Sequence, residues 1–205
     1  MAKKKVKKKL VTSKKIDVDQ ILLGKRQLFL FDVIDKKLAK ELVKKMIALD
    51  KISHQPIMLY INSGGGSLDS GYSIIDTMKS IASPVFTLVV GGAYSMAGLI
   101  SIAGDHRLMT RNSTWMAHDG AVETGGKFND VIHYGKHIEQ TQAHIFQFLR
   151  EHTKLSEEEL DKAKLGQLWL FPEECRERDI VDVVIELNRR KKIRWQRGAK
   201  PTSSK

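Results

Sequence analysis

Hydrophobic positions recur with two different periods along this chain of 205 residues. Short apolar runs of strand length alternate with segments in which apolar residues return every three or four positions, as on one face of a helix. Strands are expected at 27–31, 57–61, 85–90 after Pro84, 107–109, 114–116, 168–171 and 181–185, and helices at 35–49, 72–81, 96–103, 129–153 and from Ser156 and Pro172. Strands that alternate with helices predict an α/β fold with βαβ units and a largely parallel sheet.

The pattern of two of these segments also predicts that they are buried. Residues 57–61 form a continuous apolar run, which predicts a buried strand. Residues 96–103 are apolar on all sides, which predicts a buried helix. Ser156 and Glu159 have the spacing of a capping box and therefore mark the start of a helix.

The net charge of +11 is concentrated at the two ends of the chain. Residues 1–15 and 187–205 each hold eight basic residues and no acid, so residues 16–186 keep 19 basic against 24 acidic residues. We therefore expect one domain at 16–186 between two solvated, disordered basic tails. Such tails could contact nucleic-acid phosphates weakly and without sequence preference.

The cysteine content and the hydropathy of the chain indicate its cellular compartment. Cys175 is the single cysteine, so no intrachain disulfide is expected, and its sequence neighbours favour a small packed side chain over a reactive thiol. No run of about 18 apolar residues predicts a membrane span, and the lysine-rich start is not followed by the apolar segment of a signal peptide. These features favour a cytoplasmic protein.

Ser95 is a candidate nucleophile because it lies where a strand-like run gives way to the apolar helix, and Tyr94-Ser95-Met96 is flanked by the small residues Gly91-Gly92-Ala93 and Ala97-Gly98. The pattern departs from a strict G-x-S-x-G, since Ala93 and Ala97 replace the glycines. The alternative is a serine whose hydroxyl bonds to a neighbouring carbonyl in a helix start.

The glycine turn at 64–66 precedes a helix and offers bare backbone N–H groups to an anion. It lacks the G-K-[ST] of a phosphate-binding P-loop, so an oxyanion is a better candidate than a nucleotide. His118 ends a strand-like run and is a candidate base, although a lone histidine there is more often structural. His133 and His137 are spaced for zinc, but the glutamate of H-E-x-x-H is absent, which favours solvated or interface histidines.

Several motifs in one order, from about residue 20 to 186, resemble the proteolytic subunit of the Clp protease, a serine peptidase family. The motifs are Leu59-Tyr60-Ile61-Asn62-Ser63-Gly64-Gly65-Gly66, Ile75-Asp76-Thr77-Met78, Ala93-Tyr94-Ser95-Met96, Asn112-Ser113, Met116-Ala117-His118, His152-Thr153, Pro172-Glu173-Glu174 and Asp179-Ile180-Val181.

The resemblance implies a crotonase-like fold of repeated βαβ units with a protruding handle helix from Asn129. It also implies paired heptameric rings around a chamber, no cofactor, and ATP used only by a Clp-type unfolding ATPase. Ser95 matches the family's nucleophile and His118 its general base, while the N–H groups of Gly66 and Met96 match its oxyanion hole. The strand that holds substrate backbone corresponds to residues 122–126, with Val122, Thr124, Gly125 and Gly126 as the substrate-binding positions.

The chain departs from the family pattern in three places. An ungapped count puts Gln167 where the family has the third, aspartate member of the triad; glutamine can fix a histidine tautomer but adds no charge. Asp119, Asp161 or Asp179 could substitute, or the chain could be a catalytically weak subunit of a mixed ring. Gly64 replaces a proline in the glycine turn, and the lysine-rich start differs from the family's axial loops, which leaves the ATPase partner open.

Overall fold

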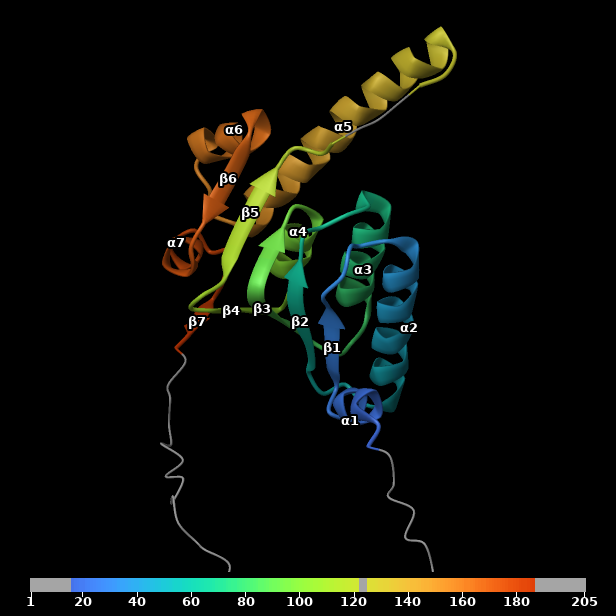
Figure 1. Ribbon diagram of the computed structural model, residues 1–205, viewed down its shortest axis with the longest axis vertical. Coiled ribbons are helices and arrows are strands. Elements are labelled where there is room, and N and C mark those ends of the chain that lie inside the picture. Colours follow the sequence, from blue (N-terminus) through green and yellow to red (C-terminus); the bar gives the residue numbers. More distant parts are fainter. Residues whose placement is uncertain (1–15, 122–124, 187–205) are drawn as a thin grey trace, which may run out of the picture.

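A seven-stranded, mostly parallel sheet forms the centre of the molecule, which is a computed structural model that describes residues 16–121 and 125–186 (Figure 1). The strands are β1 (Gln27–Leu30), β2 (Ile57–Ser63), β3 (Val85–Tyr94), β4 (His106–Thr110), β5 (Thr114–His118), β6 (Gln167–Leu170) and β7 (Val183–Ile185). The helices are α1 (Val18–Gly24), α2 (Lys36–Ile52), α3 (Leu68–Ser80), α4 (Met96–Ile102), α5 (Phe128–His152), α6 (Glu157–Leu165) and α7 (Pro172–Glu177).

The main path of the sheet runs β1-β2-β3-β4-β7 with every neighbouring pair parallel. Strand β5 leaves this path: it pairs in parallel with the end of β3 and in antiparallel with β6. The βαβ units and the largely parallel sheet expected from the sequence are therefore confirmed, and the β5–β6 pair is a small antiparallel extension of it.

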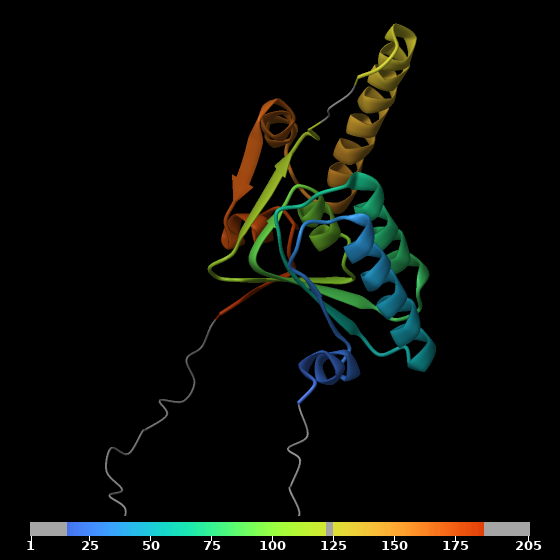
Figure 2. The same ribbon diagram turned by 45° about the vertical axis from the view of Figure 1, so that its right-hand side comes forward.

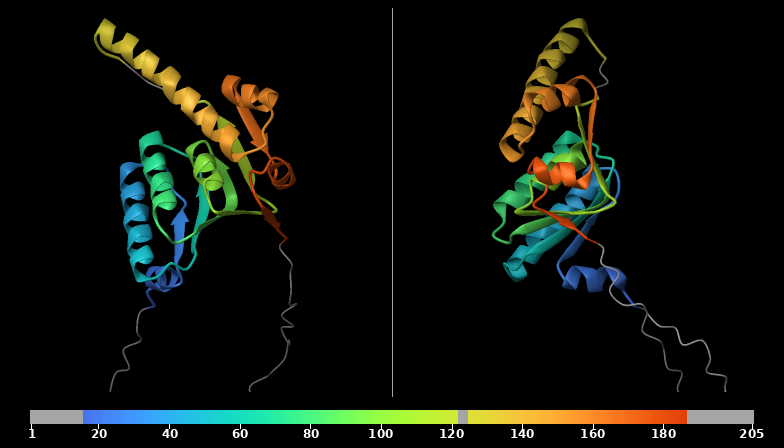
Figure 3. Two further views of the ribbon diagram at one scale, coloured as in Figure 1. Left: turned by 180° about the vertical axis from the view of Figure 1, so that it is seen from behind. Right: turned by 90° about the vertical axis from the view of Figure 1, so that its left-hand side faces the viewer.

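Helices α2, α3 and α4 lie side by side on one face of the sheet, as the turned views show (Figures 2 and 3). Helix α2 buries Ala39, Leu42, Met46 and Leu49, which return every three or four residues. Full burial of one leucine or methionine stabilises the fold by roughly 1.5–3 kcal/mol. All seven residues of α4 are buried, so the expectation of a buried helix is confirmed.

The opposite face of the β1–β2 region is less covered, which corrects one expectation. Residues of β2 alternate between buried and half-buried or exposed positions instead of being buried throughout. Phe29 and Tyr60 stack on that second face with ring centroids 5.0 Å apart, and Phe29 stays 38% exposed. An apolar run therefore did not distinguish a strand covered on both faces from one covered on a single face.

Strand β3 is longer than its apolar run and changes partner along its length. Its first part pairs with β4 and its last part, Gly92–Tyr94, pairs with β5. The change occurs at Gly91, whose φ of 98° lies in the left-handed region. A Cβ there would lie 2.7 Å from the Asn62 side-chain oxygen, so the bend requires glycine. This bend carries the end of β3 toward β5 and sets the position of the residue that follows.

Helix α5 projects away from the body, as expected for a handle helix (Figures 1 and 3). Only its carboxyl-terminal part is buried, through Ile145, Phe146 and Leu149. Near its start it exposes Phe128 and Ile132, at 80% and 46%. The single chain leaves these side chains uncovered.

Local signals placed most element boundaries correctly. Asp35 and Ser156 cap α2 and α6 through their side chains, and the Ser156–Glu159 capping box is present. Pro172 is the first residue of α7, as expected. Helix α1 was not expected, because its seven residues bury no side chain and so lack a clear apolar period. No helix within the described ranges is long and apolar enough to cross a membrane. The expected tails, 1–15 and 187–205, lie outside the described residues.

Candidate active site

Ser95 occupies a strained turn between β3 and α4. Its φ of 55° and ψ of −124° are unusual for a residue with a side chain, and such conformations cost about 1–3 kcal/mol unless the surroundings hold them. The Ser95 N–H donates to the Met116 carbonyl at 2.9 Å, and its carbonyl accepts from the Leu99 N–H at 3.2 Å. The side chain does not cap α4. The sharp strand-to-helix turn is confirmed, and Ser95 is half-buried there.

The glycine turn lies directly against this residue. A Cβ on Gly65 would lie 2.9 Å from the Ser95 Cβ and 3.1 Å from the Met96 nitrogen, and the φ of Gly65 is 98°. The close approach and the left-handed backbone both require glycine. The turn that follows β2 therefore meets the turn that follows β3, although about 30 residues separate them along the chain.

The turn is fixed from its other side by the segment before α2. The Ile34 N–H donates to the Gly65 carbonyl at 2.9 Å, and the Ser67 N–H donates to the Ile34 carbonyl at 2.8 Å. In a parallel bridge of this kind, the residue between those two partners directs its own N–H away from the bridge. That residue is Gly66, whose N–H is thereby left for another acceptor.

Met96 supplies a second N–H beside the first. As the first residue of α4, it has no intrahelical acceptor for its amide hydrogen. Both donors lie in the small region where the two turns meet. Two backbone N–H groups next to a half-buried serine hydroxyl are the components of an oxyanion hole.

His118 is brought to the same region by strand pairing. Tyr94 is the register partner of Met116, and His118 lies two residues further along β5, hence on the same face as Met116. Because the Ser95 N–H bonds to the Met116 carbonyl, the serine and the histidine lie on adjacent segments. Within the described residues no hydrogen bond joins their side chains. Catalytic hydrogen bonds are often long in structures without substrate.

Gln167 lies directly opposite His118 in the antiparallel β5–β6 pair, so the ungapped count put it beside the histidine's backbone position. Its side-chain oxygen, however, accepts from the Trp169 indole N–H at 2.9 Å. The Trp169 ring in turn packs edge-on against Tyr94, with centroids 5.1 Å apart. This arrangement was not expected from the sequence. The two-residue spacing of Gln167 and Trp169 at the start of β6 was the available signal.

Asp119, Asp161 and Asp179, the acids that could substitute for the third triad member, each have different surroundings. The Asp179 carboxylate forms an ion pair with Lys154 at 2.7 Å, and the Asp179 carbonyl accepts from Arg107. Asp161 is exposed on α6, and its charge acts on Arg150. The backbone N–H of Asp119 donates to a carbonyl of α6, which fastens the end of β5.

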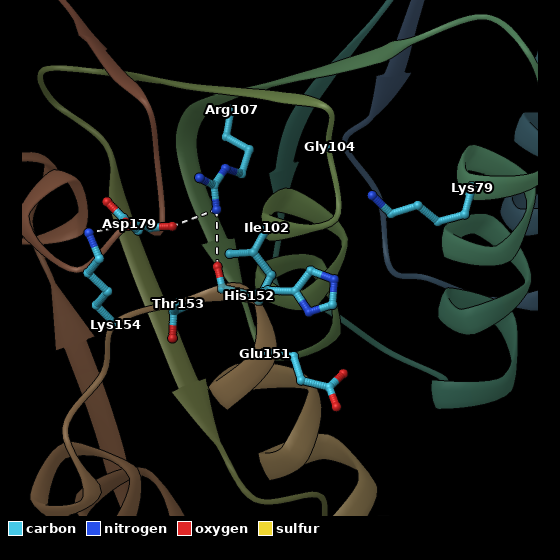
Figure 4. A pocket seen from close by; sticks show the side chains of 9 residues that line it. All are labelled: Lys79, Ile102, Gly104, Arg107, Glu151, His152, Thr153, Lys154 and Asp179. Carbon is cyan, nitrogen blue, oxygen red and sulfur yellow. Dashed lines mark hydrogen bonds and ion pairs between the residues drawn. The ribbon is translucent and has the colours of Figure 1, made fainter.

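Arg107 organises a separate cluster, shown in Figure 4. It bonds to the carbonyls of His152 and Asp179 and to the Asp182 carboxylate, and so ties β4 to the end of α5 and the segment before β7. Burial opposes ionisation of Asp182, but hydrogen bonds and charge from Arg107 outweigh it and lower the pKa of that carboxyl. A pocket of about 440 Å³ opens beside these groups. It holds acids and bases together, which is typical of a structural ion-pair cluster.

The substrate-binding positions are described in part. Val122 and Thr124 lie outside the described residues. Gly125 and Gly126 lie just before α5, and Gly126 has a φ of 140°. A Cβ on either would meet nothing within 4 Å, so this segment borders open space.

Metal ligands and Cys175 are the remaining candidate groups. In the part of the chain that the structure describes, no three His, Cys, Asp or Glu side chains gather as a metal site. Cys175 is fully buried, and burial together with nearby Glu174 raises the pKa of its thiol to about 12. The expectation of a packed side chain is confirmed.

Known proteins resemble this chain over most of its length. The family model described as Clp protease matches residues 11–188. The ATP-dependent Clp protease proteolytic subunit 1 of Chlamydia muridarum is 33% identical over 173 residues, which are 82% of this chain and 90% of that protein. The ATP-dependent Clp protease proteolytic subunit of Deinococcus radiodurans is 31% identical over 176 residues, which are 84% and 86% of the two chains.

These matches include both turns, the strand that ends in His118 and the handle helix, in the order in which the fold uses them. The mixed α/β architecture agrees with that family as well. The chain therefore belongs to the Clp protease family.

Proposed function

We propose that this chain is a serine endopeptidase that hydrolyses peptide bonds of unfolded polypeptides inside a ring-shaped oligomeric chamber. The meeting of the two turns carries the proposal, because it sets the half-buried Ser95 beside the N–H groups of Gly66 and Met96. Membership in the Clp protease family supports the reaction class. His118 on the adjacent strand supplies the base.

In the proposed reaction the Ser95 Oγ attacks the carbonyl carbon of the scissile peptide, and His118 accepts the hydroxyl proton. The negative charge that develops on the carbonyl oxygen is stabilised by the Gly66 and Met96 N–H groups, at about 3–4 kcal/mol per donor. His118 then gives the proton to the leaving amine. Water hydrolyses the resulting acyl-enzyme by the same steps, which frees Ser95.

The proposed substrate is an extended peptide. It would lie along residues 122–126, of which Gly125 and Gly126 border open space and offer backbone groups for strand addition. Backbone recognition of this kind accepts many sequences, which suits the degradation of unfolded chains.

The proposed assembly is a pair of stacked heptameric rings of this chain. The exposed apolar residues near the start of α5, Phe128 and Ile132 among them, support it, since a helix that projects alone leaves them in water. A second copy of the handle would cover them. The relatives' name, ATP-dependent protease subunit, supports a Clp-type ATPase as the partner that unfolds and delivers substrates. We propose a cytoplasmic location for this assembly.

The test uses the purified full chain with fluorogenic peptides and a fluorophosphonate serine probe. We expect peptide cleavage and labelling of one serine, and loss of both in Ser95→Ala. Ser101→Ala is the matched control, because Ser101 is a buried serine on α4 whose hydroxyl bonds to the Gly98 carbonyl. Labelling that persists in Ser95→Ala would refute the assignment of the nucleophile.

A second candidate function is a catalytically weak subunit of a mixed ring. Two observations favour it: Gln167 lies opposite His118, where the family resemblance implies an aspartate, and its oxygen is directed to Trp169. This reading expects an inactive parent that still assembles and gains turnover in Gln167→Asp. Robust cleavage by the purified parent would exclude it.

A further inference from the structure

Five side chains share one face of the sheet beside the candidate nucleophile. Tyr94, Met116 and Trp169 are register partners across β3, β5 and β6, and their side chains therefore point to the same side. His118 and Gln167 form the next pair along the same face. Gln167 therefore lies on the same face of the sheet as the candidate base His118 and as Tyr94, the residue before Ser95.

The Gln167 amide has one group that can accept a hydrogen bond, its oxygen. The Trp169 indole nitrogen is a donor only, so the 2.9 Å contact between them assigns the oxygen to Trp169. That oxygen has a second lone pair, but within the described residues it accepts from Trp169, and the NH₂ group can only donate. The oxygen that would orient His118 as a third triad member is thus directed along β6 instead of across to β5.

The contacts continue from Trp169 to the nucleophile turn. The Trp169 ring meets the Tyr94 ring at 5.1 Å and 62°, and the Tyr94 hydroxyl bonds to the Thr114 hydroxyl at 2.7 Å. Tyr94 immediately precedes Ser95. Trp169 is nevertheless 48% exposed, so burial alone does not fix its orientation, and its bond to Gln167 is a further restraint on the indole.

A strained backbone persists only where its surroundings over-determine it. The Ser95 φ of 55° depends on where Tyr94 and Met116 hold the end of β3. We propose that Gln167 is a positioning residue for the nucleophile turn: it clamps Trp169 against Tyr94, and the clamped pair fixes the backbone that presents Ser95. The kinetic part of this proposal rests on the proposed peptidase function, whereas the clamp itself does not.

A double-mutant cycle in the assembled full-length protein tests the clamp. Gln167→Met keeps the side-chain length and removes the acceptor, while Trp169→Phe keeps an aromatic ring and removes the donor. We expect Gln167→Met to lower kcat about five- to tenfold, the range for loss of one side-chain hydrogen bond, with KM nearly unchanged. In the Trp169→Phe background it should lower kcat no further, because its partner is already gone.

The pH profile separates this role from a direct one on His118. A clamp leaves the pH midpoint of kcat/KM unchanged in Gln167→Met, whereas loss of a histidine-orienting group shifts it. An equal loss of kcat in both backgrounds, a shifted midpoint, or a parental kcat would each overturn the proposal. Gln147→Met is the matched control, since among the described residues the side chain of that exposed glutamine bonds only to Glu151 on α5.

A spectroscopic measurement tests the contact without any turnover. Trp195, outside the described residues, is replaced by phenylalanine, which leaves buried Trp115 and half-exposed Trp169 as emitters. Gln167→Met should increase acrylamide quenching of the Trp169 component about twofold, and Gln147→Met should not. Unchanged quenching refutes the clamp even if the enzyme is active. A parent that neither cleaves peptide nor labels at Ser95 refutes the proposed function, and the quenching result still decides the clamp.

Discussion

Gly65→Ala should damage both stability and turnover, because Gly65 is the point of contact between the two turns. The new Cβ would lie 2.7 Å from the Tyr94 carbonyl oxygen and 2.9 Å from the Ser95 Cβ. The left-handed φ of 98° costs alanine about 1–2 kcal/mol, and forced displacement of well-packed atoms typically costs about 1–3 kcal/mol more. Together these predict a loss of about 2–5 kcal/mol in the free energy of unfolding.

The loss of turnover follows from the same displacement. If the glycine turn withdraws from Ser95, the Gly66 N–H leaves the developing oxyanion, and loss of one such donor lowers kcat about 10²- to 10³-fold. Denaturant unfolding at fixed protein concentration and steady-state peptide cleavage measure the two effects.

Gly64→Ala is the matched control for this experiment. Gly64 is the neighbouring residue, it is exposed, its φ is not in the left-handed region, and a Cβ there would meet nothing within 4 Å. We expect it to unfold and cleave like the parent. Parental stability and kcat in Gly65→Ala, or equal losses in both variants, would refute the argument from close approach.

Three further predictions concern the scaffold. The Cys175 thiol, buried and with its pKa raised to about 12, should react with iodoacetamide at pH 8 only after unfolding, as mass spectrometry would show; rapid native labelling would contradict its burial. Hydrogen bonds, chiefly from the Ser83 hydroxyl, lower the pKa of Asp50 to about 2. The stabilising effect of ionised Asp50 should therefore be complete above about pH 4 and should fall as the pH drops toward 2. Asp50→Asn should flatten that part of the stability–pH curve, and an unchanged curve would refute the linkage. Ser156→Ala should lower unfolding free energy by about 1 kcal/mol through loss of the cap to Glu159, measured by denaturant unfolding, and no loss would show the cap to be neutral.

Local sequence signals predicted the elements well, because their causes are local. The alternation of strands and helices, the caps at Asp35 and Ser156 and the buried helix α4 depend on side chains within a few residues of one another. Helix α1 was not predicted because it buries no side chain. The partial exposure of the second face of β2 was not predicted because an apolar run does not show whether one or both faces of a strand are covered. The family resemblance supplied the proposed roles of Ser95 and His118, which local patterns left open.

The sequence by itself determined that Ser95 follows a strand and opens a helix, that three glycines precede α3, and that Gln167 comes just before the strand expected at 168–171. Tertiary structure alone decided how these pieces meet. At the bend at Gly91, β3 changes its pairing partner from β4 to β5, and the β3–β5 pairing brings His118 near Ser95. It also decided that the Gln167 oxygen bonds to Trp169. The reason is that strand partners are chosen among residues far apart in sequence, and that the acceptor of an indole N–H, even one two residues away, depends on packing and hydrogen-bond satisfaction over the whole sheet.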